Sequence, residues 1–489
     1  MVAPRFDPPG LAKKDSTAKM EALFNSHLGP GHTALLLLCV LIALGFEFVN
    51  GFHDTANAVA TVIYTNALRP TTAVVLSGVC NFLGVFLGGI AVAMGIMKLL
   101  PVELLVEQGA GAGLAMVFAL LLSAILWNLA TWYKGIPSSS SHTLIGAIIG
   151  VGLGNSLRPG HTFGVGVNWD KARDVGAALL FSPIFGFLAA AGLLLLMKRY
   201  TRLKGLLIAP PKDTAPPPGT RALLIGTCSA VSFAHGSNDG QKGVGLMMLI
   251  LMGLLPAQFA LNIHADRATI ARSASAAQAL EATVTAHADA SARAEADRAV
   301  VQLRAVRTLL HDRASTQAVP PGERFHVRQA ILLADKSVDR LVKSGGLGLT
   351  PSEAVALRRE RSELRAMTDY APRWVLVAIA LALGVGTMVG WKRIVVTVGE
   401  KIGSSHLTYA QGASAELVAA STIGLSALAG LPVSTTHVLS SGVAGTMVAN
   451  GSTLQRSTVR NILLAWGLTL PATITLSAVL FLLFRLVLA

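Results

Sequence analysis

Two acidic motifs inside apolar stretches carry the side chains best suited to chemistry. The first, NGFHDTANAVAT, contains Asp54 and Asn57 and follows the apolar run 34–46. The second, AHGSNDGQKGVG, aligns Asp239 with Asp54 and places Lys242 where the first has Asn57. The two residues of each pair are three apart, so on a helix they share one face. Ionisable groups inside a membrane span are costly and therefore candidates for function, although Asp239 and Lys242 could simply hold two helices together.

Two runs of hydroxyl residues form a second repeated feature. PSSSSHT begins at Pro137 and PVSTTHV begins at Pro432, each within an apolar segment. One or two hydroxyls in a span usually bond back to the helix, but a run after a proline in both halves favours another role. Proline suits the first turn of a helix, where free amides and hydroxyls meet the positive end of the dipole and form an anion site. The predicted oxyanion ligands are Ser138, Ser139, Ser140, Ser141, Ser434, Thr435 and Thr436.

Carboxylates beside an anion site need a positive partner. Asp54 and Asp239 would repel an oxyanion unless a cation binds with it or the acids take up protons. Hydrogen phosphate also carries an O–H that a carboxylate can accept, whereas sulfate has none, so phosphate is the predicted anion. The predicted coupling residues for a cation or proton are Asp54, Asn57, Asn238, Asp239, Lys242 and Glu416, and the supporting histidines are His53, His142, His235 and His437, of which His142 and His437 could equally brace the fold.

The composition indicates which elements position these residues. The chain has 489 residues, 52% hydrophobic and only 13% charged, with a mean hydropathy of +0.58. Its apolar residues come in long blocks, several of which reach the ~20 residues that a helix needs to cross a bilayer. The sequence therefore predicts an all-α, polytopic integral membrane protein with about 10–12 membrane segments. A β-barrel would show short alternating segments instead.

The net charge of +14 does not indicate nucleic-acid binding. Basic residues gather in loops between apolar blocks, as in the segment 197–221, which the positive-inside rule places in the cytoplasm. Cys39, Cys80 and Cys228 are scattered through apolar runs, so neither a disulfide framework nor a cysteine metal site is expected. Residues 1–33 contain no apolar signal core, so the first span is predicted to act as its own uncleaved signal.

The chain is predicted to contain two related halves. Besides the acidic motifs, the hydroxyl runs align from proline to histidine. Two such halves joined by a basic, Pro-rich linker are typical of secondary transporters with inverted repeats, interrupted helices and re-entrant hairpins. The apolar stretch 222–256 would run ~52 Å as one straight helix, so an interruption is expected at each acidic motif.

A segment in the second half breaks the membrane pattern. It is rich in Ala, Arg and Glu and reads as helical, and its scarcity of aromatic residues argues against RNA binding. The predicted parts are a tail at 1–33, a first membrane repeat at 34–197, a linker at 198–221, the start of the second repeat at 222–257, a soluble helical insertion at 258–371 and the rest of the second repeat at 372–489.

The motifs resemble those of the inorganic phosphate transporter (Pit) family, specifically its bacterial low-affinity permeases. The resemblance rests on FVNGFHDTANAVATVIYT and SFAHGSNDGQKG and covers 34–256 and 372–487. It implies a symporter with alternating access that uses protons and accepts phosphate as a neutral complex with a divalent metal such as Mg²⁺. Sodium-coupled relatives typically carry an asparagine three residues after each motif aspartate and a glutamate in the second span. Lys242 and Asn81 stand at two of those positions here, which weakens the case for sodium.

The sequence thus predicts a multi-pass phosphate symporter of the cell inner (plasma) membrane. It is not predicted to be an enzyme, and no cofactor or permanently bound metal is expected. Its predicted partners are inorganic phosphate, protons, co-transported divalent metal ions and the lipid bilayer, with no nucleic acid and with a homodimer left open. A sodium-coupled phosphate or sulfate permease on the same scaffold is the alternative within transport. A membrane-embedded hydrolase is the alternative from another class, but neither G-x-S-x-G nor H-E-x-x-H occurs in the chain.

Overall fold

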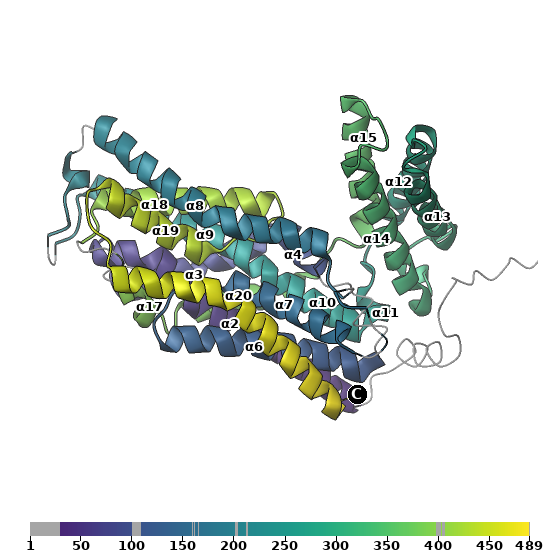
Figure 1. Cartoon of the computed structure of the whole chain (residues 1–489), viewed down its shortest axis with the longest axis horizontal. Helices are drawn as coiled ribbons and strands as arrows, with labels where there is room; N and C mark the ends of the chain where they lie inside the picture. Colours follow the sequence, from purple (N-terminus) through teal and green to yellow (C-terminus); the bar gives the residue numbers. More distant parts are fainter. Residues whose placement is uncertain are drawn as a thin grey trace, which may run out of the picture. The chain divides into compact units, whose positions relative to one another are not determined.

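The chain forms two compact units of helices joined by loops (Figure 1). The structure is a computed structural model, and it describes residues 30–99, 109–158, 160, 162–164, 166–200, 204–211, 214–397, 402 and 406–488; the side chain of Asn57 lies outside the described part. One unit contains Leu251–Tyr370 and is named the insertion unit. The other contains nearly all the remaining described residues and is named the membrane unit.

The membrane unit consists of long apolar helices with shorter helices packed among them. Its helices are α2 Pro30–Tyr64, α3 Pro70–Leu87, α4 Ala91–Met97, α6 Gly109–Tyr133, α7 Ser140–Ser156, α8 Trp169–Tyr200, the 3₁₀-helix η1 Lys204–Leu207, α9 Pro218–His235, the π-helix η2 Gly236–Gly240, α10 Gln241–Leu254, α16 Arg373–Thr387, α17 Lys392–Val396, α18 Tyr409–Leu428, α19 Thr435–Ala449 and α20 Arg456–Leu488. Within the described residues, five helices (α2, α3, α6, α8 and α20) are long and apolar enough to cross a membrane, and α16 is a shorter apolar helix. The prediction of an all-α membrane protein is confirmed.

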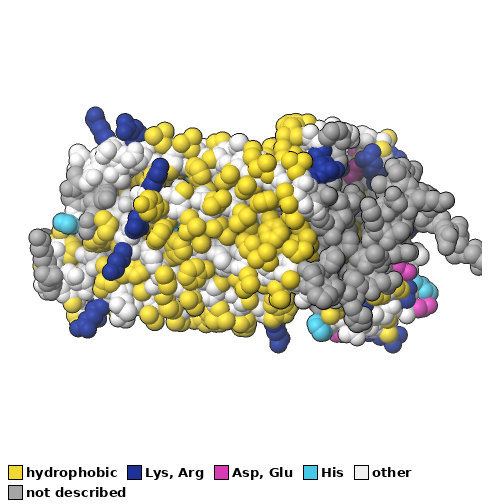
Figure 2. All heavy atoms as spheres, turned by 90° about the horizontal axis from the view of Figure 1, so that it is seen from below, with side chains coloured by type: hydrophobic (Ala, Val, Ile, Leu, Met, Phe, Trp, Pro, Cys, Tyr) yellow, Lys and Arg dark blue, Asp and Glu magenta, His cyan; other side chains and the backbone are white. Residues whose placement is uncertain are grey.

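The outer surface of the membrane unit is apolar. Figure 2 shows hydrophobic side chains covering most of one face, with Lys and Arg side chains toward its left end. Two of the long helices expose large apolar side chains, among them Phe181, Phe185 and Leu188 of α8 and Leu463, Leu464 and Leu468 of α20. Continuous apolar surface of this kind suits hydrocarbon rather than water.

The packing of the membrane unit exchanges helices between its two halves. Helix α7 of the first half packs on α20, and α19 of the second half packs on α8. Gly150 lies against the backbone carbonyl of Ile474, and Gly445 lies against that of Phe187, so a Cβ at either glycine would collide with backbone. Small residues at such positions let membrane helices approach closely. Reciprocal packing suits two related halves, while their inverted relation and the re-entrant hairpins stay predictions.

The predicted interruption of the helices at the acidic motifs is wrong in detail. Helix α2 runs unbroken through the first motif. In the second half, α9, η2 and α10 follow one another directly, and the motif forms a π-helical turn rather than a break. A π-turn adds one residue to the helix without separating its two parts, and such turns often occur at functional sites. Its glycines serve close packing, since a Cβ at Gly236 would meet the backbone of Asn81.

The insertion unit is a small helical bundle. Its helices are α11 Pro256–Phe259, α12 Arg267–His287, α13 Arg293–Leu310, the 3₁₀-helix η3 Thr316–Ala318, α14 Pro321–Lys343, α15 Pro351–Leu364 and the 3₁₀-helix η4 Arg365–Met367. Asp266 caps α12 by accepting a hydrogen bond from the Thr269 amide, and Thr350 forms a capping box with Glu353. Apolar side chains of these helices, such as Leu280 of α12 and Leu303 of α13, form a core of their own. The predicted bounds 258–371 lie close to those of this unit.

Candidate functional site

The two motif aspartates and the two hydroxyl runs meet at one buried point. Asp54 lies on α2 and Asp239 on η2, and both are buried. The Ser140 hydroxyl, from the first run, lies 2.8 Å from Asp54 Oδ2 and 3.2 Å from Asp239 Oδ2. The Thr436 hydroxyl, from the second run, donates to Asp54 Oδ1 at 2.5 Å. Four segments far apart in the sequence therefore converge on one carboxylate pair.

Two members of the hydroxyl runs serve the helices themselves. Ser139 is the N-cap of α7 and accepts a hydrogen bond from the His142 amide. Ser434 is the N-cap of α19 and accepts from the His437 amide in the same way. Serine is favoured at this position because its oxygen satisfies an amide that the first turn leaves without a partner. These caps fix where α7 and α19 begin, and so place the next hydroxyls at the aspartates.

The remaining hydroxyls point to different neighbours. Ser138 lies 3.2 Å from the Thr469 hydroxyl of α20, away from the aspartates. Ser141 donates to the Val433 carbonyl at 2.8 Å. The Thr435 hydroxyl is buried and has no hydrogen-bond partner among the described residues. Of the seven predicted ligands, Ser140 and Thr436 thus contact the aspartates directly.

Lys242 is buried with its ammonium group fully paired. Its Nζ lies 2.7 Å from Asp239 Oδ1 and 2.9 Å from the Val433 carbonyl, and it also donates to the Ser141 hydroxyl. Only 2% of the residue is exposed. A buried ammonium requires such compensation, because removing a charge from water is costly. Its three contacts are a carboxylate, a carbonyl and a hydroxyl, all oxygen atoms.

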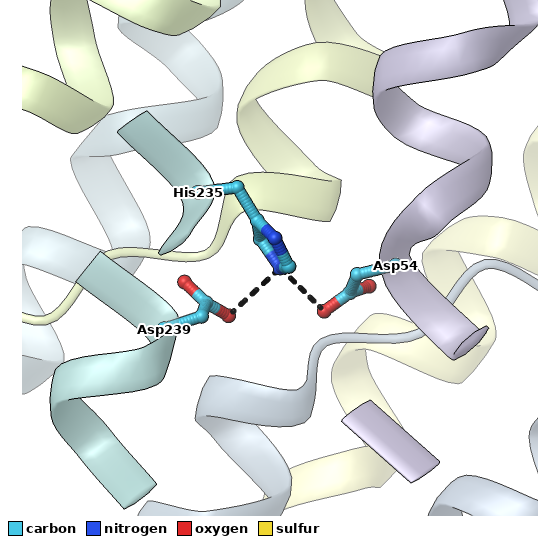
Figure 3. A group of neighbouring side chains, drawn as sticks. All are labelled: Asp54, His235 and Asp239. Atoms are coloured by element: carbon cyan, nitrogen blue, oxygen red, sulfur yellow. Dashed lines mark ion pairs between the residues drawn. The ribbon is translucent and has the colours of Figure 1, made fainter. Parts of the chain in front are cut away.

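Two motif histidines flank the aspartates. His53 Nδ1 lies 3.4 Å from Asp54 Oδ1, while its Nε2 lies 3.2 Å from the Thr131 hydroxyl of α6. His235 directs its Nε2 between the two acids, 3.8 Å from Asp54 Oδ2 and 3.7 Å from Asp239 Oδ2, as Figure 3 shows. Asp54, His235 and Asp239 form a group whose ligand atoms lie close enough together to hold one metal ion.

Three other predicted site residues contact the loops and helices around the site rather than the aspartates. The Asn238 amide donates to the Leu431 carbonyl at 3.1 Å and accepts from the Val433 amide at 3.4 Å, so it fixes the loop that leads into α19. The His142 and His437 rings lie 4.5 Å apart, and the His437 ring stacks on Trp466 at 3.9 Å. These aromatic contacts favour the bracing role for both histidines.

Glu416 forms its hydrogen bond with a helix that carries neither aspartate. It lies on α18, is fully buried, and accepts a hydrogen bond at 2.5 Å from the Thr227 hydroxyl of α9. Its other oxygen, Oε1, has no hydrogen-bond partner among the described residues. Glu47 of α2 resembles it, since it is buried and its Oε1 also has no partner in the described part of the chain.

The contact between Asn81 and His235 was not predicted from the sequence. Asn81 of α3 accepts a hydrogen bond at 2.9 Å from His235 Nδ1 and donates at 2.9 Å to Thr387 of α16. The signal that could have found it is an amide side chain inside the apolar stretch VVLSGVCNFLGVF, since a buried amide needs partners.

Known proteins match this chain over most of its length. Residues 50–477 match the phosphate transporter family. The chain is 45% identical over 480 residues to the low-affinity inorganic phosphate transporter PitA of Escherichia coli K12, covering 91% of this chain and 96% of that protein. It is 43% identical over 476 residues to PitB of the same strain, covering 91% and 95%.

A solved structure supports the fold. The sodium-dependent phosphate transporter covers 93% of this chain and 100% of its own, with a TM-score of 0.53 and 20% identity, which supports a shared fold and nothing finer. With most of its length matched, the chain belongs to the phosphate transporter family and is a multi-pass membrane protein.

Proposed function

We propose that this protein imports inorganic phosphate across the plasma membrane by proton symport, as a neutral complex with a divalent metal ion. The observation that carries the proposal is the buried Asp54 carboxylate, which accepts hydrogen bonds from Ser140 and Thr436 of the two hydroxyl runs. The names of PitA and PitB, low-affinity inorganic phosphate transporters, support the choice of substrate.

A metal ion resolves the conflict between the carboxylates and an anionic substrate. The hydroxyls that would bind phosphate donate to Asp54, so a bare anion would compete with the carboxylate for them. It would also face two buried carboxylates at close range, which repel it. A divalent ion attracts both the carboxylates and the phosphate oxygens. The complex also avoids much of the cost of removing a bare dianion from water.

The surroundings of Lys242 support coupling without sodium. Its ammonium contacts a carboxylate oxygen, a backbone carbonyl and a hydroxyl, the kinds of ligand that transporters offer to sodium. A fixed positive charge at this position repels a second cation by ordinary electrostatics. Lys242 therefore acts as a tethered substitute for one transported cation.

Glu416 is the residue best placed to carry the coupling proton. It is a buried carboxyl that accepts a hydrogen bond from the Thr227 hydroxyl, and no cationic side chain acts on it among the described residues. An isolated buried carboxylate is costly, and taking up a proton removes that cost. Binding and release of a proton at Glu416 can therefore accompany the movement of phosphate.

Uptake into proteoliposomes tests the proposal. Purified protein is given a proton gradient alone or a sodium gradient alone, each with and without Mg²⁺ or Mn²⁺, and labelled phosphate is measured. We expect accumulation with the proton gradient, collapse on adding a protonophore, indifference to sodium, and stimulation by the divalent ion at constant phosphate. Uptake that follows sodium and ignores protons would instead favour a sodium-coupled phosphate permease on the same scaffold.

A further inference from the structure

A chain of hydrogen bonds fixes the orientation of the His235 ring. The Thr387 hydroxyl donates to the Leu383 carbonyl at 2.8 Å, so its oxygen accepts the bond from the Asn81 amide nitrogen. The amide oxygen of Asn81 then faces His235 Nδ1, 2.9 Å away. An amide oxygen can only accept, so Nδ1 carries the hydrogen. In the neutral imidazole, Nε2 is therefore the atom with the free lone pair.

The lone pair of His235 points at two carboxylate oxygens. Nε2 lies 3.8 Å from Asp54 Oδ2 and 3.7 Å from Asp239 Oδ2 (Figure 3), and it has no hydrogen-bond partner among the described residues. The residue is only 4% exposed. Three acceptor atoms facing one another in a buried place repel each other unless a proton or a metal ion lies between them.

In both aspartates, the two carboxylate oxygens have different surroundings, arranged in the same way. Asp54 Oδ1 accepts from Thr436, and Asp239 Oδ1 accepts from Lys242, so these oxygens are held by the protein. Both Oδ2 atoms face His235 and are joined by Ser140, which lies within hydrogen-bond distance of each. The protein thus orients one oxygen of each carboxylate toward a common centre.

We propose that Asp54 Oδ2, Asp239 Oδ2 and His235 Nε2 bind the metal ion of the transported complex, and that Asn81 positions His235 for this task. The inference rests on the proposed function and names its metal ligands. Two ligands bound tetrahedrally at ~2.1 Å lie about 3.4 Å apart, so the separations of 3.7 and 3.8 Å need only a small contraction. A histidine ligand that donates its other N–H to a carbonyl oxygen is the usual arrangement in metal sites.

The nitrogen ligand sets the class of metal. Mg²⁺ and Ca²⁺ prefer oxygen ligands only, whereas imidazole suits ions such as Zn²⁺, and the affinity of a mixed nitrogen and oxygen site for first-row ions is lowest for Mn²⁺ and rises through Co²⁺. The site should therefore bind Mn²⁺, Co²⁺ or Zn²⁺ more tightly than Mg²⁺, although all of these ions can neutralise phosphate. Asn81 contributes to this preference without contacting the metal.

Binding of Mn²⁺ to the full-length protein in phosphate-free buffer tests the site. Pulsed electron paramagnetic resonance of the purified protein should show coupling of Mn²⁺ to an imidazole nitrogen, and this coupling should vanish in His235→Asn. Asn81→Leu removes the acceptor of the Nδ1 hydrogen and should weaken Mn²⁺ binding ~10–100-fold. Asn81→Asp retains an acceptor and should keep Mn²⁺ binding near or above that of the wild type.

A matched control separates this effect from damage to the fold. Asn155 is a buried asparagine of α7 whose amide oxygen accepts from Arg158, and Asn155→Leu should leave Mn²⁺ binding unchanged. Equal losses in Asn155→Leu and Asn81→Leu would overturn the positioning role of Asn81.

The same assay separates the site from the proposed function. Mn²⁺ binding without nitrogen coupling in the wild type, together with metal-stimulated uptake, would overturn this site and leave metal–phosphate transport standing. Nitrogen-coupled Mn²⁺ together with metal-independent uptake would support the site and overturn the proposed substrate. Absence of Mn²⁺ binding at millimolar concentration would overturn the metal site and leave His235 as a bridge that carries a proton.

Discussion

At the scale of single residues, Asp54 connects both halves of the membrane unit. Hydroxyls from α7 and α19 donate to it, and the His235 ring of the second motif lies beside it. Hydrogen bonds to a charged acceptor are stronger than neutral ones, so Asp54 contributes to the packing as well as to binding. A change at this residue therefore affects both the substrate site and the contact between the halves.

Replacing either motif aspartate by asparagine should stop transport. Asp54→Asn and Asp239→Asn each remove a negative charge from the metal and alter hydrogen bonds worth ~1.5–3 kcal/mol apiece, so phosphate uptake should fall ~100-fold or more. Asp170→Asn is the control, because Asp170 is exposed and pairs with Arg173 on the surface. The measurement is labelled phosphate uptake, normalised to protein in the membrane. Near-normal uptake by both variants would show that Asp54 and Asp239 are not essential residues of the transport site.

The hydroxyls at the aspartates should determine the affinity for phosphate. Ser140→Ala and Thr436→Ala each remove one donor at the site and should raise the KM for phosphate roughly tenfold. Thr143 provides a control, because its hydroxyl bonds the Ser139 carbonyl within α7, and the aligned position of the second half is Val438. Thr143→Val should therefore keep the wild-type KM. A KM unchanged in both alanine variants would place the anion site elsewhere.

Removal of the tethered ammonium should create a sodium requirement. Lys242→Asn leaves the Asp239 carboxylate, the Val433 carbonyl and the Ser141 hydroxyl without their cation and supplies an amide oxygen. We expect uptake by this variant to be low without sodium and to recover as sodium rises, whereas Lys242→Met should stay inactive. Initial rates in sodium against choline buffers check this. A Lys242→Asn variant that sodium leaves unaffected would refute the substitution of one cation by Lys242.

The sequence predicts single residues of the site better than their contacts. Asp54 and Asp239 are found from the repeated motif, because a buried charge is rare and costly. The bond between Asn81 and His235 joins residues 154 apart, and no local spacing encodes it. The same holds for the Val433 carbonyl that Lys242 contacts, since any backbone carbonyl could have served.

At the scale of elements, the π-turn η2 replaces the helix interruption that the sequence pattern predicted at the second acidic motif. The glycines of GSNDG predict a break, because glycine disfavours helix. The helix instead continues through an i→i+5 turn, which turns Asp239 and its neighbours toward the centre without exposing backbone groups. Neighbouring helices decide this outcome: α3 packs closely on η2, and a short-range pattern does not contain that contact.

The insertion unit offers an element whose stability should depend on pH. Glu281 of α12 accepts bonds from Arg304 and Arg307 of α13, and Arg304 foremost holds the pKa of the Glu281 carboxyl below its usual value. A lowered folded-state pKa gives stability that is present above the unfolded value of ~4.3 and is lost as pH falls through the folded value. Because the arginines are exposed, we expect a contribution of only ~0.2–1 kcal/mol at pH 7.

Hydrogen exchange of α12 and α13 in the full-length protein measures this contribution. Glu281→Gln should exchange faster than the wild type at about pH 7, and the difference should shrink as pH falls and disappear once the wild-type carboxyl is protonated in the folded state. A difference of equal size at both pH values would show that packing, rather than the ion pairs, causes the loss.

At the scale of the whole molecule, the exchange of helices between halves suggests how the site is exposed in turn. Helices α7 and α19 carry the hydroxyl runs, and each packs on a long helix of the opposite half. Rocking of one half against the other would therefore move the two runs relative to the aspartates. Alternating access of this kind is the motion that the resemblance implies for two related halves.

The overall fold was largely predictable, because apolar blocks and the duplicated motifs dictate long helices in two related sets. The all-α membrane class follows from the long apolar blocks, since only helices and barrels satisfy their backbone inside a bilayer and a barrel would show short alternating segments. Packing partners such as α7 with α20 do not follow, because apolar helices offer many similar surfaces to one another. Close approaches at Gly150 and Gly445 decide between them, and these become visible only in three dimensions.

Coupling is a property of the whole molecule, and Glu416 provides its test. The residue bonds Thr227 of α9 and makes no hydrogen bond to either motif aspartate within the described residues, so it can carry a proton without binding phosphate. Glu416→Gln is permanently neutral, and we expect it to lose accumulation driven by a proton gradient. Exchange of labelled for unlabelled phosphate needs no net proton movement, so it should stay within a few-fold of the wild type.

The two readouts of Glu416→Gln separate coupling from binding. Loss of both phosphate exchange and accumulation would mean that Glu416 supports the site itself. Retention of both would mean that the proton is carried by another residue. Thr227→Val serves as a second variant, because it keeps the carboxyl and removes its hydroxyl donor. A carboxyl without that donor holds its proton more firmly, since the hydrogen bond favours the charged form. Release of the proton from Glu416 should therefore be slower in Thr227→Val. Accumulation of phosphate should weaken for this reason, while phosphate exchange continues.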